Sequence, residues 1–212
     1  TADAFEQVTA ADPTQIIAVN QAVDAHTKES LEDIAPTTVK PDGYEDWQVP
    51  WEKQVETIAD AVGKKDEGDK LIDDTEKAFE EFRHEHAELQ DKSAAIVMPY
   101  DGKIGLYTEE DGRGQFIEDL GMEIPDALQG DGGSFFVDIA PENYAKLNQV
   151  DYLFVLDYNG SSDALKKDKT FQGLDIVKDD RVRYLDTDTG NAMSMPNPVT
   201  IPWAVDKFEE KL

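Results

Sequence analysis

The sequence predicts an α/β fold with a mainly parallel sheet, and three observations carry this prediction. After Asp91, short apolar segments typical of buried strands alternate with segments of helical periodicity. Before that point, an apolar stripe at helical spacing runs through residues 71–89, with charged side chains on the opposite face. The 9 Phe, 7 Tyr and 3 Trp are spread over the whole length, which favours a packed core over a disordered chain.

The first fifty residues predict short elements only. Residues 5–11 have helical spacing, residues 15–19 form a short apolar strand, and residues 27–34 form a short helix with one apolar edge. Residues 35–39 are expected to be extended, and residues 40–50, with two prolines, to form a loop.

Two helices are predicted next. Pro50 suits the first turn of a helix over residues 51–62, which Gly63 ends. The apolar stripe through residues 71–89 predicts a helix of about 25 residues, twice the usual length. A helix of this length favours a spine that connects two parts of the fold.

Beyond Asp91 the chain predicts alternating strands and helices. The strands are expected at residues 94–98, 105–108, 135–139 (strand or loop), 152–156 and 182–185. The helices are expected at residues 115–120, 141–147, 162–167 and 200–211.

The composition argues against several classes of function. The 47 acidic residues outnumber the 20 basic ones and give a net charge of −27, so nucleic acid and anionic lipid would both be repelled. The absence of cysteine excludes disulfides, thiolate metal sites and a cysteine nucleophile. No apolar run approaches the roughly 18 residues of a membrane span.

The motifs that could carry chemistry or metal fail on spacing. Residues 186–191 resemble the start of a calcium loop, but Gly190 occupies the fifth position and Asn197 the twelfth, where ligands are required. We therefore predict a polar turn there. His84 and His86 are two residues apart on a helix and face different ways, so no metal site is predicted. The sequence contains neither a nucleophile elbow nor a phosphate-binding Gly-Lys-Ser/Thr loop.

Polar and aromatic residues gather where the predicted strands and their loops end, which is where α/β sheets bind ligands. Arg113 is one of only four arginines, and it stands at a predicted helix start, where the helix dipole disfavours a cation. The predicted ligand-binding residues are Asn20, Gln21, Trp47, Tyr107, Thr108, Arg113, Ser194 and Asn197. Tyr44, Tyr100 and Asn159 occupy similar positions.

Several segments, in order, resemble the ABC-transporter solute-binding proteins for ferric siderophores and related iron chelates. Ile34-Ala35-Pro36-Thr37 matches an ile-ala-pro-thr stretch of that family, and Phe116–Gly121 resembles the end of its second-lobe helix. The other matching segments are Phe5–Ile17, Trp51–Gly63, Tyr107–Gly121 and Val177–Tyr184.

The resemblance implies two lobes joined by a rigid spine helix. Residues 1–49 would be the C-terminal part of the N-lobe, residues 50–91 a helix pair that includes the spine, and residues 92–212 a complete C-lobe. Only about 15 residues precede the first strand, so the resemblance implies that most of the N-lobe is missing, and with it the leader and the lipidated cysteine of a surface lipoprotein.

The resemblance also assigns roles. Arg113 and Tyr107 would face the ligand from the second lobe, beside the loop 193–197, and Asn20 and Gln21 would face it from the first. Glu118 would dock into a basic pocket of the permease.

The expected function is that of a non-enzymatic, extracytoplasmic receptor, periplasmic or anchored to the cell surface by a lipid, that passes a ferric siderophore to an ABC permease. The protein would contribute no metal ligand and hold no cofactor. Four arginines and a net charge of −27 favour a hydroxamate chelate over an anionic catecholate. A haem carrier with Tyr107 as axial ligand, a cobalamin carrier, an enzyme that uses an acidic pair, and a cell-wall module stay open as alternatives.

Overall fold

The computed structural model describes residues 2–212, with side chains from Ala4 onwards. Two compact units divide the chain between Ile72 and Asp73, so the boundary lies within one long helix. None of the described helices combines the length and the apolar character needed to cross a bilayer.

The first unit contains a small parallel sheet and helices at the positions that the sequence predicts. Its two strands, β1 and β2, pair in parallel with Ile17 opposite Thr38. The elements are α1 (Ala2–Ala10), β1 (Ile16–Ala18), α2 (Ala25–Glu32), β2 (Thr37–Val39), α3 (Trp51–Ala61) and the first part of α4 (Lys65–Glu85). Asp24 caps α2 by accepting a hydrogen bond from the backbone N–H of Thr27 at 2.7 Å.

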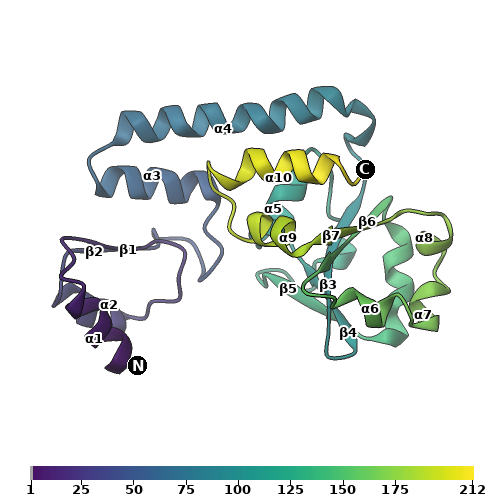
Figure 1. The fold of residues 1–212 in the computed structure, drawn as a ribbon, viewed down its shortest axis with the longest axis horizontal. Helices are drawn as coiled ribbons and strands as arrows, with labels where there is room; N and C mark the ends of the chain where they lie inside the picture. The colour runs from purple at the N-terminus through teal and green to yellow at the C-terminus, as the bar shows by residue number, and fades with distance from the viewer. Residues whose placement is uncertain (1) are drawn as a thin grey trace. The chain divides into compact units, whose positions relative to one another are not determined.

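The second unit is built on a sheet with the strand order β5-β4-β3-β6-β7 (Figure 1). Its strands are β3 (Ala94–Tyr100), β4 (Lys103–Tyr107), β5 (Phe136–Ile139), β6 (Tyr152–Asp157) and β7 (Val182–Asp186). Its further α-helices are α5 (Gly112–Asp119), α6 (Ser162–Leu165), α7 (Lys169–Gln172), α8 (Asp175–Lys178), α9 (Thr187–Ser194) and α10 (Thr200–Glu209). Three 3₁₀ segments complete it: η1 (Ala87–Leu89), η2 (Asp126–Leu128) and η3 (Pro141–Gln149).

The sheet is mixed: two of its four strand pairs are parallel and two are antiparallel, so the prediction of a mainly parallel sheet is confirmed only in part. Strands β3, β5, β6 and β7 run in one direction and β4 alone runs against them, because β4 pairs antiparallel with both β3 and β5. The reason is the two-residue turn Asp101-Gly102, with φ of 44° and 76°. Positive φ at both positions matches the turn that joins adjacent antiparallel strands with the twist they need.

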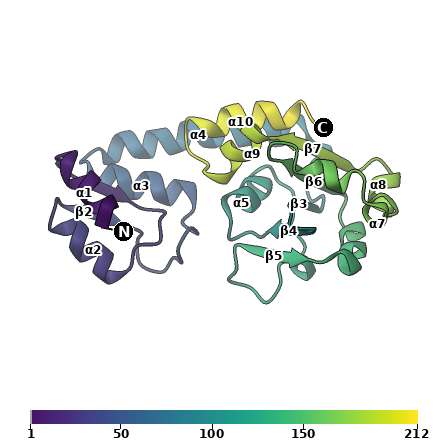
Figure 2. The same ribbon diagram turned by 60° about the horizontal axis from the view of Figure 1, so that its bottom comes forward.

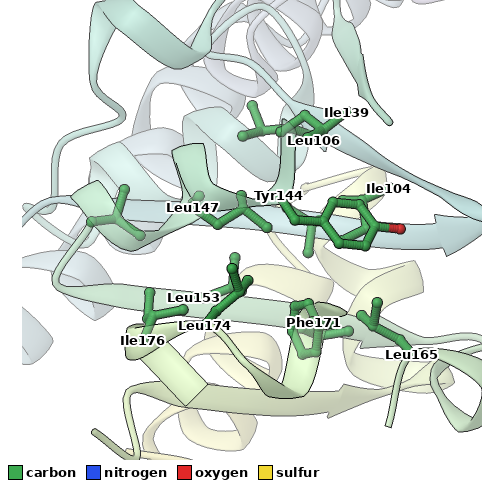
Figure 3. Close-up of a cluster of buried hydrophobic side chains, with 14 of the residues drawn as sticks. Ile104, Leu106, Ile139, Tyr144, Leu147, Leu153, Leu165, Phe171, Leu174 and Ile176 are labelled. Carbon is green, nitrogen blue, oxygen red and sulfur yellow. The ribbon is translucent and has the colours of Figure 1, made fainter. Parts of the chain in front are cut away.

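Helices cover both faces of this sheet, with α5 and α9 on one side and α7 and α8 on the other (Figures 1 and 2). Figure 3 shows the core beneath α6–α8, where side chains from β3, β4, β5 and β6 meet those of η3 and the short helices. This core includes Ile104, Leu106, Ile139, Tyr144, Leu147, Leu153, Leu165, Phe171, Leu174 and Ile176.

An aromatic cluster fills the other side of the sheet. Phe208 of α10 lies 4.5 Å from Phe154 of β6 and 6.1 Å from Phe116 of α5, measured between ring centroids. The later part of α4 joins this cluster through Phe79, 5.5 Å from Phe116, and Phe82, 6.1 Å from Phe208. Burial of such rings contributes roughly 1.5–3 kcal/mol each.

His86, just beyond α4, connects the end of that helix to the last helix of the chain. Its Nε2 lies 2.9 Å from the carboxylate of Glu209 in α10, and its Nδ1 lies 3.4 Å from that of Glu88. Burial lowers the pKa of His86, but the bonds to the two glutamates outweigh burial and raise the pKa above its ordinary value.

The predicted long helix is confirmed but is shorter than expected, because α4 has 21 residues and ends at Glu85, and η1 follows it only after the non-helical His86. The polar turn predicted at residues 186–191 was wrong, since these residues cap and begin α9. Asp186 accepts hydrogen bonds from the N–H and the hydroxyl of Thr189, both at 2.9 Å. An Asp-x-x-Thr start of this kind is a helix cap, and the tertiary contacts of α9 continue the helix after it.

Candidate functional site

The candidate site centres on Arg113, in the first turn of α5. Its Nε donates to Asp111 Oδ1 at 2.7 Å and its Nη2 donates to Oδ2 at 2.9 Å, so the carboxylate holds the guanidinium by two bonds. Asp111 is also the N-cap of α5 and accepts from the backbone N–H of Arg113 at 2.9 Å. One carboxylate therefore starts the helix and fixes the direction of its cation.

The ring of Tyr107, at the end of β4, stacks against the guanidinium of Arg113. The Arg113 Cζ atom lies 3.7 Å from the ring centroid, which is a close cation–π contact. The Tyr107 hydroxyl donates to the sulfur of Met98 at 3.6 Å, so the ring is held at its far end as well. Among the described residues, none accepts a hydrogen bond from Arg113 Nη1. A ligand oxygen could accept one there.

The electrostatic surroundings keep this cation charged. Burial lowers the pKa of Arg113, but the hydrogen bonds and the charge of Asp111 raise it well above its ordinary value. Burial raises the pKa of the Tyr107 hydroxyl, and the charge of Arg113 only partly offsets this effect. Tyr158, the residue after β6, is close enough to interact electrostatically with both groups.

Glycines allow the walls of the site to approach closely. A Cβ on Gly112 would lie 2.7 Å from Pro196 Cδ and 3.2 Å from the Ser194 carbonyl oxygen, so the 194–196 loop packs against the start of α5. A Cβ on Gly190 would lie 2.9 Å from the hydroxyl of Tyr158. The site thus draws on β4, α5, the residue after β6, and the end of α9.

Three of the predicted site residues are engaged in holding the backbone. Thr108 is 1% exposed and donates its hydroxyl to the Ser134 carbonyl at 2.6 Å. The Ser194 hydroxyl donates to the carbonyl of Asn191 at 2.8 Å. The Asn197 carboxamide oxygen accepts from the backbone of the first turn of α10, at 3.0 and 3.2 Å. These side chains shape the loops around Arg113 and Tyr107.

In the first unit, the structure brings Asn20 close to the loop that carries Trp47. The Asn20 carboxamide oxygen accepts from the N–H of Val49 at 3.2 Å, while Gln21 is exposed beside it. Trp47 is 41% exposed and has φ of 69°, a left-handed conformation that aromatic residues rarely adopt. Strain of this kind concentrates at ligand-contacting positions.

Glu118 lies on the second half of α5, away from the Arg113 end of the helix. Burial, followed by the charges of Glu109 and Glu123, raises the pKa of its carboxyl to about 6. Its carboxylate is partly desolvated, and none of the described residues offers it a cationic partner.

Sequence reasoning missed Asp111 and Tyr158. Asp111 could have been found as the N-cap in front of Gly112, because an Asp before a helix start is a strong signal. Tyr158 lies next to Asn159, which the sequence did indicate, but it is Tyr158 that interacts electrostatically with Arg113. Across residues 2–212, no group of three or more His, Asp or Glu side chains is arranged to hold a metal ion.

A fixed cation beside an aromatic ring, at the end of a strand in a helix-covered sheet, is a typical setting for binding a small solute. The sequence pattern of the periplasmic binding protein family matches residues 3–189, and the chain belongs to that family. Members of this family are components of transporters and not enzymes, so the prediction of a non-enzymatic protein is confirmed. No curated protein matches the chain by sequence.

Several solved structures share the fold. The iron-uptake substrate-binding protein PiaA of Streptococcus pneumoniae is 25% identical with a TM-score of 0.81, and the match covers 97% of this chain and 72% of PiaA. The FhuD protein of S. pseudintermedius is 23% identical with a TM-score of 0.79, over 97% of this chain and 72% of FhuD. A siderophore-binding protein from Thermobifida fusca is 22% identical with a TM-score of 0.72, over 97% and 76% of the two chains. The predicted resemblance to siderophore-binding proteins is thereby confirmed.

Proposed function

We propose that this chain is the extracytoplasmic substrate-binding component of an ABC transporter and that it captures a ferric siderophore of the hydroxamate type. The observation that carries the proposal is the Arg113 guanidinium, held by Asp111 and stacked on Tyr107 with Nη1 left open. PiaA, which shares the fold, has been solved in complex with ferrichrome.

The chemistry of this arrangement suits an uncharged or weakly charged chelate. The oxygens around chelated iron carry partial negative charge, and a fixed guanidinium N–H can donate to one of them without displacing it from the metal. The rings of Tyr107 and Tyr158 offer apolar surface to the organic part of the ligand. The net charge of −27 would repel a tris-catecholate complex, which is strongly anionic.

A fluorescence titration tests the proposal. The three tryptophans, with Trp47 exposed, report binding when the natural full-length protein is titrated with a ferric hydroxamate, a ferric catecholate, ferric citrate, haemin and cobalamin. We expect saturable quenching by the hydroxamate at submicromolar concentration. Saturation by haemin with a Soret band, or by cobalamin, would reassign the ligand, and flat titrations with every chelate from a folded sample would refute the proposal.

The variant Arg113→Lys isolates the role of the guanidinium because it keeps the charge and loses the fork. We expect binding to weaken by about 1–3 kcal/mol, or about 5- to 150-fold in Kd. The matched control is Arg183→Lys on β7, whose guanidinium donates only to backbone carbonyls, among them that of Leu212 at 3.2 Å. Equal affinities for the two variants would remove Arg113 from the site.

We also propose that Glu118 takes part in docking to the permease. A carboxylate that is partly desolvated gains from meeting an arginine of a partner, because pairing removes the cost that raises its pKa to about 6. Glu118→Gln should lower transport in reconstituted vesicles and leave chelate affinity unchanged. Glu123→Gln, the exposed neighbour, is the matched control; transport that falls equally in both variants would refute a specific role.

A further inference from the structure

A second cavity, of about 260 Å³, lies in the C-terminal unit at the carboxyl end of β3. The turn Asp101-Gly102 and the residues that follow β6 form its rim. Its lining residues are Pro99, Tyr100, Asp101, Gly102, Lys103, Tyr144, Ser161, Ala164, Leu165 and Asp168. Such a volume is just below that of drug-sized sites, so a ligand here would be a fragment-sized molecule.

The cavity is separate from the Arg113 site. Ile104 and Leu106 of β4 belong to the core under α6–α8, whereas Tyr107, the next residue along that strand, points to the opposite face. The lining residues Tyr144 and Leu165 lie in this α6–α8 core. A ligand in this cavity would therefore not touch the Arg113 site, on which the proposed function rests.

Tyr144 marks the cavity as a polar site built into an apolar wall. The residue is 2% exposed, and its ring packs edge-on against Phe171, with centroids 6.2 Å apart. Its hydroxyl points out of the hydrophobic cluster, at the end where Leu165 lies (Figure 3). None of the described residues forms a hydrogen bond with this hydroxyl, so it is open to a partner from the cavity.

The other open polar atoms of the cavity are anionic. Asp168 uses Oδ1 to cap α7, accepting from the backbone N–H groups of Thr170 at 2.7 Å and Phe171 at 3.1 Å, and its Oδ2 is not used. Asp101 is exposed and forms no ion pair with the described residues.

The remaining polar groups of the lining already have partners. The Lys103 ammonium is paired with Asp138 and lies 4.9 Å from the centroid of the Tyr100 ring. The Ser161 hydroxyl accepts from the Tyr158 N–H at 3.1 Å. The unsatisfied groups therefore attract a cation, while Pro99, Leu165 and the Tyr144 ring provide an apolar surface.

We propose that this cavity binds a small amphipathic cation, a primary ammonium on a short apolar or aromatic body. The ammonium would donate to Asp168 Oδ2 and to the Tyr144 hydroxyl oxygen, and the body would lie between Pro99 and Leu165. The charge of Asp168 acts on Tyr144, where burial and then this charge raise the hydroxyl pKa, so the phenol stays neutral as the ammonium binds.

Titrations with benzylamine and its neutral isostere benzyl alcohol, followed by backbone amide NMR shifts at neutral pH, test the inference. We expect benzylamine to shift resonances around residues 99–103 and 161–168 and to saturate with a Kd on the order of 1 mM, the affinity of a fragment. Benzyl alcohol should bind at least tenfold more weakly. Absence of saturation with benzylamine, or equal affinity for the two compounds, would overturn the proposal.

Two variants locate the binding. Asp168→Asn keeps the capping oxygen and removes the charge, so we expect affinity to fall about tenfold with the NMR spectrum otherwise preserved. Tyr144→Phe removes only the unpartnered hydroxyl and should weaken binding by several fold. Asp163→Asn, an exposed position on α6, is the charge-matched control and should change nothing. If Asp163→Asn lowers affinity as much as Asp168→Asn, the effect is one of net charge and the site is refuted.

Discussion

Replacing Asp111 by Asn removes one negative charge and leaves the shape of the side chain in place. The Asn carboxamide oxygen can still accept from the backbone N–H of Arg113, so the cap of α5 is kept. What is lost is the paired acceptor of the Arg113 guanidinium. The substitution therefore tests whether this pair holds the cation of the candidate site.

The burial of the two side chains sets the size of the effect. Arg113 is 15% exposed and Asp111 is 9% exposed, so the charge left behind is largely excluded from water. Removing one partner of a buried pair costs about 3–5 kcal/mol. The contact of Arg113 with the Tyr107 ring, at 3.7 Å, remains and offsets about 1–2 kcal/mol of this cost. We expect the free energy of unfolding to fall by about 1–4 kcal/mol.

Urea unfolding followed by far-ultraviolet circular dichroism measures the change in the free energy of unfolding. The variant Arg113→Met and the double variant Asp111→Asn/Arg113→Met complete a mutant cycle. The double variant should recover most of the loss, because no uncompensated charge stays buried and Met still packs on the Tyr107 ring. A loss below about 0.5 kcal/mol in Asp111→Asn, or a double variant as unstable as the sum of the two single variants, would show that the pair is not coupled.

Three further predictions concern pH and packing. Glu118→Gln should stabilise the protein by about 1 kcal/mol at pH 7.5 and not at pH 4. The reason is that the stability conferred by the protonated carboxyl is complete below pH 4.5 and is lost as pH rises through about 6. Equal unfolding midpoints of the natural protein and the variant at pH 7.5 would contradict this. His86 has a raised pKa, so its bonds to its two glutamates stabilise the fold most fully below pH 6.5 and less as pH rises through the folded-state pKa. The stability difference between the natural protein and His86→Gln should shrink accordingly in unfolding curves from pH 6 to 9, and a constant difference would rule the bonds out. Gly114→Ala should prevent native packing of α5, since the new Cβ would lie 1.9 Å from the Thr108 carbonyl oxygen; a near-native melting temperature would refute this.

The fold could be predicted where one local signal was enough. Alternating apolar segments located β3, β6 and β7, and helical spacing with Pro50 and Gly63 located α3. The direction of β4 was mistaken because the Asp101-Gly102 turn was not weighed, although it is a strong hairpin signal. The helices α7 and α8, of four residues each, were not predicted because so few residues produce no measurable periodicity.

The candidate site was predicted in part. Arg113 and Tyr107 stood out because a rare cation and an aromatic residue fell at strand and helix ends, and the structure stacks them on one another. Their contact depends on the hairpin and on α5 crossing the sheet, neither of which leaves a pattern in the chain. Thr108 and Asn197 matched the same rule, and the structure uses their side chains to hold backbone.

The sequence by itself determined the class of this protein, its strand and helix positions, and the residues from which a site could be made. These properties follow from apolar spacing, capping residues and net charge, which act within a few residues or over the whole chain. Only the tertiary structure decided that Asp111 holds Arg113 against Tyr107 and that Tyr144 leaves a hydroxyl open in a second cavity. Such contacts join side chains from different elements, and their energies depend on burial, which emerges only when the sheet and its helices pack.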